Sequence, residues 1–439
     1  MSSSSAPSSL PPLAVVGIGY VGLPLALNFC GVGRKVIALD VDPVKVEKIN
    51  AGQSYIKHIP SEDIQKEVSR GALTASLDMA EASKCDAIII CVPTPLDRHL
   101  EPDLSYVTST VQALLPHLSK GQTMSLESTT YPGTTEEVLM PMVESMGFKV
   151  GVDYHLAYSP EREDPGNEQF PSHTIPKLVS GQTPACLEKA LALYKSAYHT
   201  VVAVSGTKVA EFAKLLENTY RSVNIGLVNE LKIVADKMGI DIWDVINAAA
   251  TKPFGFKAFY PGPGVGGHCI PVDPFYLTWK AKEYGIHTRF VELAAETNNS
   301  MAAYVVQRVS EALNKRRKPL NGSRILAVGL AFKEEVDDLR ESPTFRIMDL
   351  LAEQGSIVDY YDPYIPSIMR TREHLNWAGK LSVAWDKATL ASYDCAVICT
   401  GHKAINKSEL LAWSDCIVDT RNLLGSLPEA DRAGKVLKA

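Results

Sequence analysis

The chain has 439 residues, of which 46% are hydrophobic and 21% are charged, and its formal net charge at pH 7 is -6. This length exceeds that of one ordinary domain, so we expect two or three domains. The slightly acidic balance is not typical of proteins that bind nucleic acid or an anionic membrane surface. No apolar run reaches the roughly 18 residues that cross a bilayer. We therefore predict no nucleic-acid partner and no membrane partner.

Residues 1–12, MSSSSAPSSLPP, are rich in serine and proline and contain no apolar core segment. This composition predicts a disordered tail, not a signal peptide, and a cytoplasmic location. The eight cysteines of such a chain are expected to be reduced thiols. Cys395 and Cys399 lie in the apolar run CAVICT with no second pair of ligands nearby. We interpret them as core residues and predict no metal site.

Apolar residues 13–16 lead into the turn GIGYVG at 17–22, which is followed by a helical apolar pattern and a second strand that ends at Asp40. This is the order of a dinucleotide-binding βαβ unit, in which glycines let the backbone approach a pyrophosphate at the start of the helix. A carboxylate after the second strand favours the ribose hydroxyls of NAD over the 2′-phosphate of NADP. NAD is therefore the predicted cofactor. An aspartate that only opens a turn before Pro43 is the alternative.

Two further apolar runs, DAIIICVPTP and QTMSLESTT, end in small polar residues. In an open α/β sheet the carboxyl ends of the strands form the crevice where ligands bind. Thr94 and Thr129 are therefore candidate contacts to cofactor or substrate. Turn residues that end a strand are an equally good interpretation of both threonines.

Residues 207–238 form one long helical pattern without proline, and a second helical stretch covers about 289–317. The order strand, helix, strand then returns in RILAVGLAFK, SPTFRIMDLLAEQG and IVDYYDP, which predicts a second doubly wound unit. Its glycine fingerprint is lost, and Lys333 stands where backbone would approach a pyrophosphate. We expect a phosphate-bearing nucleotide there instead of a second dinucleotide.

The predicted fold class is therefore α/β, with two Rossmann-like doubly wound domains joined by a long central helix and a helical middle domain. After the tail at 1–12, the expected domains are an NAD-binding Rossmann domain at 13–206, a central helical domain at 207–318 and a nucleotide-binding Rossmann-like domain at 319–439.

The stretch GPGVGGHCIPVDPFYL at 262–277 surrounds one thiol, that of Cys269, with flexible backbone. A cysteine that serves as a small core residue would instead sit inside a strand or helix. We therefore expect Cys269 to be a nucleophile in extended backbone at the end of a loop. On the long helix Lys214, Asn218 and Arg221 have i, i+4 and i+7 spacing and share one face. For that face alone a solvated polar stripe is the better interpretation.

An NAD site together with a nucleophilic cysteine indicates the oxidation of an aldehyde to an acid. A thiolate adds to the aldehyde, the alkoxide expels hydride, and a thioester remains. Lys214 and Asn218 are candidates to stabilise the oxyanion, while Glu161 and Asp273 are candidates to position the hydrolytic water. A nearby cation or helix N-terminus would help to ionise the thiol. His268 is expected to shape the pocket and not to act as the base.

Over essentially its full length the sequence resembles the UDP-glucose/GDP-mannose dehydrogenase family, and most of all its bacterial UDP-N-acetylglucosamine and UDP-N-acetylmannosamine 6-dehydrogenases. The motifs that carry the resemblance run in the family's order. They are GIGYVG, VDPVKVEKIN, CVPTP, ESTTYPGTT, SPER, AEFAKLLENTYR, GPGVGGHCIPVDP, GLAFKEEVDDLRESP and VDTRN. The resemblance implies two NAD-dependent oxidations of the C6 hydroxyl of a UDP-hexose, giving a carboxylate, with UDP bound by the C-terminal domain.

The resemblance also implies roles for single residues. Cys269 is the nucleophile, Asp273 and Thr129 position water and proton, and Glu161 acts in thioester hydrolysis. The implied catalytic residues are Cys269, Lys214, Asn218, Asp273, Glu161 and Thr129. The implied cofactor contacts are Gly17, Gly19, Tyr20, Val21, Gly22, Asp40, Lys45, Thr94 and Thr129. The implied substrate contacts are Arg162, Lys214, Asn218, Arg221, Lys257, Gly266, Lys333, Arg340 and Arg421.

The sequence departs from the UDP-glucose branch at His268, Val272 and SPERED, where that branch typically has tyrosine, lysine and an NPEFL loop. The glutamate that this branch carries later in the loop falls at Pro165. These differences, together with PFYLTWKAKEYG, predict UDP-N-acetylglucosamine as the substrate, with UDP-N-acetylmannosamine and UDP-glucose as alternatives. The resemblance further implies a homodimer or higher homo-oligomer built on the long helix.

Two other functions fit part of this sequence. A β-hydroxyacid dehydrogenase shares the dinucleotide domain and the long helix, but it needs neither the cysteine nor a third domain. A nucleotide-sensing protein without activity is disfavoured because Cys269, Lys214 and Asn218 are present together.

Overall fold

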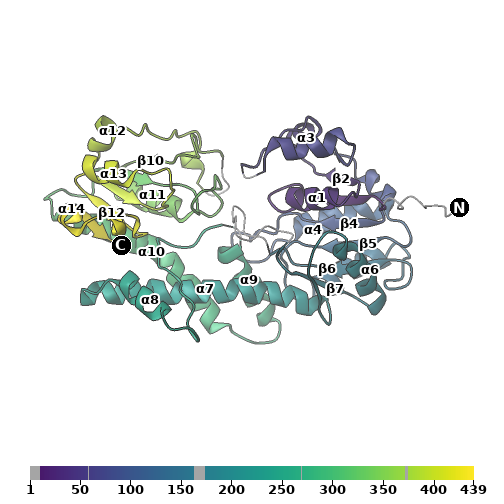
Figure 1. Cartoon of the computed structure of the whole chain (residues 1–439). Coiled ribbons are helices and arrows are strands. Elements are labelled where there is room, and N and C mark those ends of the chain that lie inside the picture. The colour runs from purple at the N-terminus through teal and green to yellow at the C-terminus, as the bar shows by residue number, and fades with distance from the viewer. Residues whose placement is uncertain (1–9, 58, 163–173, 268, 371–373) are drawn as a thin grey trace. The chain divides into compact units, whose positions relative to one another are not determined.

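The computed structural model describes residues 10–57, 59–162, 174–267, 269–370 and 374–439 (Figure 1). The chain divides into two compact units. Unit 1 comprises Met1–Glu217 and Phe275–Ile286, and unit 2 comprises Asn218–Pro274 and His287–Ala439. The domain boundaries that the sequence suggests at 206/207 and 318/319 stay predictions.

Unit 1 contains an eight-stranded sheet with the order β3-β2-β1-β4-β5-β6-β7-β8. All neighbours are parallel except β6 and β7. This strand order confirms the predicted doubly wound domain, and the order reverses between β1 and β4, where such sheets bind ligands. The strands are β1 (Leu13–Val16), β2 (Val36–Leu39), β3 (Leu73–Ser76), β4 (Ala87–Ile90), β5 (Thr123–Leu126), β6 (His155–Tyr158), β7 (Lys177–Gly181) and β8 (Val201–Ala203).

Helices cover both faces of this sheet, which is why its central strands are apolar throughout. In β1 Leu13 and Val15 join one buried cluster, whereas Ala14 and Val16 join another. The first cluster includes side chains of α1 (Gly22–Gly31), α3 (Ser61–Ser69) and α6 (Pro184–Lys195). The second includes α4 (Ser105–Leu114) and α5 (Met140–Glu144). The alternation of a strand explains the split, because successive side chains point to opposite faces.

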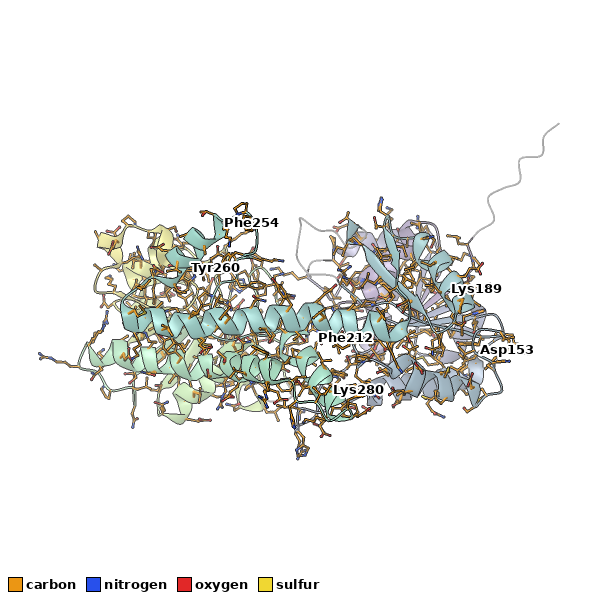
Figure 2. The ribbon with its side chains drawn as sticks, turned by 90° about the horizontal axis from the view of Figure 1, so that it is seen from below. Asp153, Lys189, Phe212, Phe254, Tyr260 and Lys280 are labelled. Atoms are coloured by element: carbon orange, nitrogen blue, oxygen red, sulfur yellow. The ribbon has the colours of Figure 1, made fainter. Side chains whose placement is uncertain are left out.

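Helix α7 (Thr207–Met238) has the bounds that the sequence predicts and is continuous over 32 residues, about 48 Å at the usual rise per residue (Figure 2). Helix α10 (Arg289–Asn314) begins where expected and ends three residues early. The two helices pack closely within unit 2 because Gly226 has no side chain. A Cβ there would lie 3.2 Å from Ala294 Cα. Asn229 Nδ2 also donates to Asn298 Oδ1 at 2.9 Å.

Helix α9 (Cys269–Lys282) corrects the prediction that Cys269 lies in extended backbone, because Cys269 is the first residue of this helix. Proline and glycine before and after the thiol indicated a loop. However, Pro271 falls among the first four residues of α9, whose N–H groups have no partner within the helix. Only Pro274 interrupts the hydrogen-bond ladder.

Unit 2 contains a five-stranded parallel sheet with the order β10-β9-β11-β12-β13, which confirms the second doubly wound domain. The strands are β9 (Arg324–Val328), β10 (Ile357–Tyr361), β11 (Cys395–Ile398), β12 (Ile417–Asp419) and β13 (Val436–Lys438). In this sheet the strand order reverses between β9 and β11, so the loop with Lys333 begins at the switch point.

The remaining α-helices of the described residues are α2 (Pro43–Asn50), α8 (Ile242–Ala250), α11 (Pro343–Glu353), α12 (Lys387–Ala391), α13 (Lys407–Trp413) and α14 (Glu429–Arg432).

Candidate active site

The turn between β1 and α1 is shaped for close packing on one side and for an approaching ligand on the other. Gly17 has φ +88°, and a Cβ there would lie 2.8 Å from the Cys91 carbonyl oxygen. A Cβ at Gly22 would lie 1.9 Å from the Gly17 oxygen. Gly19, in contrast, has open space where its Cβ would be. Helix α1 begins after Val21 without a side-chain cap. These features fit a pyrophosphate bound by backbone N–H groups.

Asp40 follows β2 and is nearly buried. Its carboxylate accepts hydrogen bonds from the amides of Ile18 and Asp42, both at 3.0 Å. Lys45 on α2 forms an ion pair with it at 3.2 Å. The carboxylate is thereby held at the end of the strand, where the sequence predicts a contact to ribose hydroxyls.

The strand ends beside this turn carry the two predicted threonines. Thr94 follows β4 and is buried, while Thr129 follows β5 and is half-buried. Thr130, the next residue, is fully buried, and its hydroxyl has no hydrogen-bond partner among the described residues. Thr130 is therefore a further candidate in this loop, which sequence reasoning passed over in favour of Thr129.

Glu161 follows β6 and joins a buried cluster of charges in unit 1. Lys177, the first residue of β7, lies with its Nζ 3.1 Å from Glu161 Oε2 and 2.7 Å from Glu127 Oε2. Tyr194 donates to Glu127 Oε1 at 2.6 Å. Burial raises the pKa of Glu127 to about 7, because the attraction of Lys177 offsets only part of it. Burial lowers the pKa of Lys177, but the two carboxylates outweigh it and hold that pKa well above its ordinary value.

The loop after β6 is also tied to α7. Lys214 is buried, and its Nζ donates to the main-chain oxygen of Glu161 at 2.5 Å. Arg162 forms an ion pair with Glu217 at 2.8 Å and donates to the Pro176 carbonyl oxygen at 2.8 Å. The structure thus brings together Lys214, Glu161 and Arg162, which the sequence assigned to one site.

Within unit 2 the structure brings together Asn218, Asp273 and the helix that begins at Cys269. Asp273 is fully buried on the first turns of α9, and its Oδ2 accepts a hydrogen bond from Asn218 Nδ2 at 2.5 Å. Cys269 is half-buried. A helix N-terminus favours negative charge, which is the form a thiolate nucleophile has. A helix N-terminus is one of the two features that, from the sequence, would help to ionise the thiol.

The glycine loop before Cys269 rests on the second Rossmann-like domain within unit 2. A Cβ at Gly266 would lie 2.7 Å from the Glu341 carbonyl oxygen, and one at Gly262 would lie 2.4 Å from the Arg421 guanidinium. The Gly267 amide donates to the Arg340 carbonyl oxygen at 2.9 Å. Close packing of this loop therefore requires glycine at 266, where the neighbour is backbone, whereas a side chain at 262 would displace the Arg421 guanidinium.

The remaining predicted substrate contacts are cationic. Lys333 is half-buried, and Arg340 is exposed and paired with Asp338 at 2.6 Å. Arg421 Nε donates to the Cys399 carbonyl oxygen at 3.0 Å. Arg221 and Lys257 are exposed, so Arg221 does not share the burial of Lys214 and Asn218, its neighbours on α7. His268 and Pro165 lie outside the described residues.

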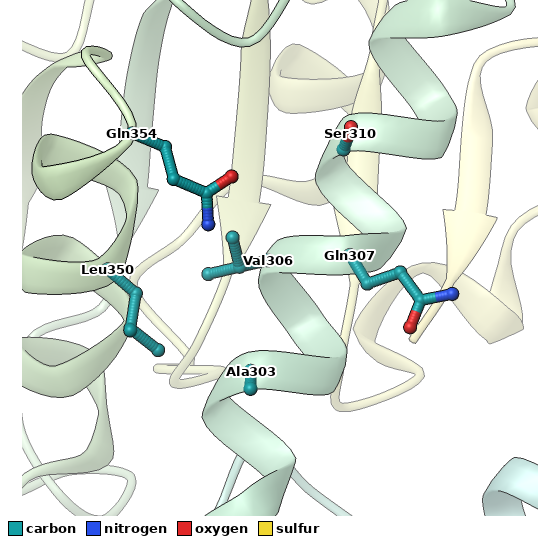
Figure 3. Close-up of a pocket in the computed structure, with 6 residues that line it drawn as sticks. All are labelled: Ala303, Val306, Gln307, Ser310, Leu350 and Gln354. Carbon is teal, nitrogen blue, oxygen red and sulfur yellow. The ribbon is translucent and has the colours of Figure 1, made fainter.

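A shallow cavity of about 300 Å³ lies apart from these residues, between α10 and α11 (Figure 3). It is lined by Ala303, Val306, Gln307, Ser310, Leu350 and Gln354. None of these side chains is a carboxylate, imidazole, amine or thiol, so the cavity lining offers no acid or base to activate the Ser310 hydroxyl. In the described part of the chain no group of three or more His, Cys, Asp or Glu residues is arranged to hold a metal ion. No described helix is long and apolar enough to cross a membrane.

Three family models match consecutive parts of the chain. They are the NAD-binding domain (residues 12–198), the central domain (208–300) and the UDP-binding domain (326–426) of the UDP-glucose/GDP-mannose dehydrogenase family. The chain belongs to this family. The predicted family membership, fold class, NAD cofactor and dehydrogenase activity are thereby confirmed. Members of the UDP-glucose/GDP-mannose dehydrogenase family that are similar to this chain differ in the sugar they are named for.

The chain is 40% identical over 359 residues to the UDP-N-acetyl-D-glucosamine 6-dehydrogenase of Pseudomonas aeruginosa. This match covers 80% of this chain and 83% of that protein. It is 36% identical over 356 residues to the UDP-N-acetyl-D-mannosamine dehydrogenase of Yersinia pestis, with coverage of 79% and 83%. Among solved structures, a UDP-D-ManNAc dehydrogenase from Pyrococcus horikoshii matches with a TM-score of 0.86 and 29% identity over 97% of this chain and 98% of that one.

Sequence reasoning missed two groups that hold this family member's predicted catalytic loops. One is the pair Glu127 and Lys177, described above. The other is Glu211 on α7, a fully buried carboxylate that accepts from the Gly133 amide at 2.6 Å and from the Thr135 amide at 2.9 Å. The sequence signal for these groups was a charged residue inside an apolar pattern. Such a residue is expected to be buried, and a buried charge usually has a partner.

Proposed function

We propose that the chain is an NAD-dependent UDP-N-acetylglucosamine 6-dehydrogenase that oxidises the C6 alcohol to a carboxylate through a thioester on Cys269. The observation that carries the reaction type is Cys269 at the start of α9, one turn from a fully buried Asp273 that Asn218 hydrogen-bonds. The choice of sugar is supported by the relative with 40% identity that is named for UDP-N-acetyl-D-glucosamine. UDP-N-acetylmannosamine is the second candidate, because a relative with 36% identity is named for it.

The overall change is RCH₂OH + 2 NAD⁺ + H₂O → RCOO⁻ + 2 NADH + 3 H⁺. NAD, when bound at residues 17–22, supplies the hydride acceptor for both oxidations. In this proposal the first oxidation gives an aldehyde. The Cys269 thiolate then forms a C–S bond to the aldehyde carbon, and the π electron pair moves to the oxygen. Lys214 and Asn218 stabilise that oxyanion. After the second hydride leaves, a thioester remains.

Hydrolysis completes the reaction. A water oxygen attacks the thioester carbon, its proton passes to Glu161, and the C–S bond breaks with its electrons on Cys269. Asp273, with Thr129 or the adjacent Thr130, positions water and proton. The nucleotide of the substrate is assigned to Lys333, Arg340 and Arg421, because guanidinium and ammonium groups suit phosphates.

We also propose that the protein is a homodimer that forms along α7. Exposed apolar side chains recur along this helix at spacings of three and four residues or their sum, which places them on one stripe. They are Val209, Phe212, Leu216, Tyr220, Leu227, Leu231, Val234 and Met238. At its N-terminal end a hollow of about 460 Å³ is lined by Pro132, Lys208, Val209, Phe212, Ala213 and Leu216. A long exposed apolar stripe is typical of an interface, and a second copy of this helix offers the matching surface. A cytoplasmic location remains a prediction.

The test is NADH absorbance after the purified protein is mixed with NAD and, separately, with UDP-N-acetylglucosamine, UDP-N-acetylmannosamine or UDP-glucose. Two NADH per sugar, formed fastest from UDP-N-acetylglucosamine, is the expected result. Preference for another of the three sugars would correct the substrate and keep the mechanism. One NADH per sugar would overturn the thioester role of Cys269.

A further inference from the structure

The loop after β5, at residues 128–135, is held by a buried carboxylate from a helix much later in the chain. Glu211 on α7 is fully buried, and its Oε2 accepts from the Gly133 amide at 2.6 Å. Its Oε1 accepts from the Thr135 amide at 2.9 Å and from the Thr135 hydroxyl at 2.7 Å. The helical segment Thr135–Leu139 begins at the end of this loop without a local side-chain cap. Glu211 therefore supplies from α7 the acceptor that a helix start usually finds next to itself.

The middle of the same loop is held by α9, in the part of that helix that belongs to unit 1. Lys280, labelled in Figure 2, has its Nζ 4.9 Å from the centre of the Tyr131 ring, and the Trp279 ring centre lies 5.0 Å from that ring. Glu137 and Glu283 each lie 2.7 Å from Lys280 Nζ, and the lysine side chain is 7% exposed. Burial lowers the pKa of Lys280, but the two carboxylates outweigh it and raise that pKa above its ordinary value. A cation therefore faces the aromatic ring, and burial strengthens their attraction.

The two predicted threonines, Thr129 and Thr130, lie between two fixed points of this loop. Just before them the Ser128 hydroxyl donates to the Val92 carbonyl oxygen at 2.7 Å, which ties the start of the loop to the chain after β4. Just after them comes Tyr131. Thr130 is fully buried, and its hydroxyl has no hydrogen-bond partner among the described residues. A buried hydroxyl is unfavourable until a partner completes it, so this position suits a group that meets a ligand or a reacting water.

We propose that Glu211 and Lys280 are positioning residues for thioester hydrolysis, which hold this loop so that a threonine hydroxyl meets the attacking water. The threonine is Thr129 or Thr130. This inference rests on the proposed function, since it assigns the control of one step of that reaction. Gly133 has φ +110°, which glycine adopts easily, so the loop has little rigidity of its own at that point. Restraint by two helices matters because a misplacement of about 1 Å can slow a step on the order of 10²-fold.

The alternative for Glu211 and Lys280 is a structural role without influence on any step. A structural role predicts lower stability, and it predicts the same factor of slowing whether or not the threonine hydroxyls are present. Positioning predicts that the effect of Lys280 on hydrolysis disappears once the hydroxyl that it positions is removed. Residues that act through one group are not additive, whereas independent residues are.

The experiment measures decay of the acyl-enzyme in the purified full-length protein, with NAD and the UDP-sugar that gives NADH in the assay above. Samples are quenched in acid during the first turnover, and intact mass reports the fraction of Cys269 that carries the acyl group. Lys280→Met should form two NADH per subunit and then stall, with hydrolysis slowed on the order of 10-fold to 10²-fold. Lys280→Arg keeps the cation and should restore most of the rate. Lys282→Met, which changes an exposed lysine of the same helix, is the matched control and should keep the parent rate.

Two double variants show whether Lys280 acts through the loop. Thr129→Val and Thr130→Val each remove one hydroxyl and keep nearly the same shape. We expect one of the two to slow acyl-enzyme hydrolysis by itself. In that background the further change Lys280→Met should slow hydrolysis by less than about twofold, against about 10-fold or more in the parent.

Glu211 is tested in the same way. Glu211→Gln replaces one carboxylate oxygen by a donor, so either the Gly133 amide or the Thr135 amide loses its acceptor. This variant should also slow acyl-enzyme hydrolysis in the parent, and much less in the background without the threonine hydroxyl. Glu188→Gln changes an exposed glutamate of α6 in the same unit and is the matched control.

The outcomes distinguish this inference from the proposed function. If the unsubstituted protein forms no NADH with any of the three UDP-sugars, the proposed function fails. If it turns over and Lys280→Met hydrolyses its acyl-enzyme at the parent rate, this inference alone is overturned. Equal slowing by Lys280→Met with and without the threonine hydroxyls would also overturn it, as would the parent rate in both threonine variants. If Lys280→Met does not fold, Glu211→Gln decides by the same criteria.

Discussion

Asp362 and His402 form a fully buried hydrogen-bonded pair in unit 2, with 3.1 Å between Asp362 Oδ2 and His402 Nε2. His402 Nδ1 accepts the Glu335 amide at 3.0 Å, so Nε2 carries the ring proton and donates it to the carboxylate. The same carboxylate oxygen accepts the Ala331 amide at 3.0 Å. The pair therefore holds both ends of the loop that contains Lys333, at the switch point of the second sheet.

Removal of the imidazole should destabilise this loop. In His402→Ala the Asp362 carboxylate loses a donor and the Glu335 amide loses an acceptor. We expect a loss of about 1–3 kcal/mol in the free energy of unfolding, as for a buried group left without a partner. Chemical unfolding measures this loss, and UDP titration should show weaker binding. His287→Ala, at an exposed histidine, should change stability by less than about 0.5 kcal/mol. Equal stability of the two variants would contradict the prediction.

The same pair predicts a dependence of stability on acid. Burial raises the pKa of Asp362, but the His402 hydrogen bond and the Ala331 and Tyr364 amides outweigh it, so the pKa lies below its ordinary value. A carboxyl with a lowered pKa stabilises the folded state fully above its unfolded pKa, about 3.9, and this contribution is lost as pH falls through the folded value. The difference in the free energy of unfolding between the parent and Asp362→Asn should therefore become smaller as pH falls below about 4. A gap that widens on acidification would refute this assignment.

Gly262 offers a test of the glycine loop that leaves the catalytic groups in place. A Cβ at this position would lie 2.4 Å from Arg421 Nη1, so Gly262→Ala should displace the guanidinium. We expect a higher KM for the UDP-sugar with little change in the KM for NAD, as steady-state kinetics can measure. Gly206→Ala is the matched control, because open space surrounds its Cβ position. If both variants show the parent KM for the sugar, Arg421 does not contact the nucleotide.

The fold was predictable where one periodicity extends over many residues. The bounds of α7 agree with its uninterrupted helical pattern, and both sheets follow from apolar strands that end in small or acidic residues. The start of α9 was not predictable in this way. From the neighbouring sequence alone, Pro271 and Pro274 argue against a helix. Only the folded chain shows that Pro271 lies in the first turn of α9, where a helix tolerates proline.

The candidate site was predictable for residues in motifs but not for those that support them. Lys177 lies between Pro176 and an apolar run, and its partners Glu127 and Glu161 are 50 and 16 residues away. No spacing rule connects positions that meet only because β5, β6 and β7 are adjacent in the sheet. Arg221 shows the opposite limit. Its helical spacing to Asn218 is correct, yet it is exposed, because spacing gives direction and not burial.

The exposed stripe of α7 predicts the oligomeric state. Leu227→Glu or Leu231→Glu would bury a charge without a partner in a dimer built on this helix, which costs several kcal/mol. We expect these variants to be monomeric and folded, as shown by light scattering and circular dichroism. Leu381→Glu changes a leucine outside α7 that is even more exposed, and it should leave the dimer intact. If the parent protein is itself a monomer, the proposed interface is wrong.

A substitution in the hydrogen-bonded pair of Asn218 and Asp273 can distinguish a role in the chemical step from a role in substrate binding. Asp273 is fully buried, and Asn218 Nδ2 donates to its carboxylate at 2.5 Å, so a neutral Asp273→Asn side chain keeps the volume but removes the charge. If Asp273 positions water and proton, kcat should fall by a factor of roughly 10²–10⁴. The KM for the UDP-sugar should change far less, and thermal unfolding should show a folded protein. Asp244→Asn, at an exposed aspartate of α8 in the same unit, controls for loss of a charge. Because Asp273 has no place in NAD binding under this proposal, an effect confined to the KM for NAD would assign it a different role.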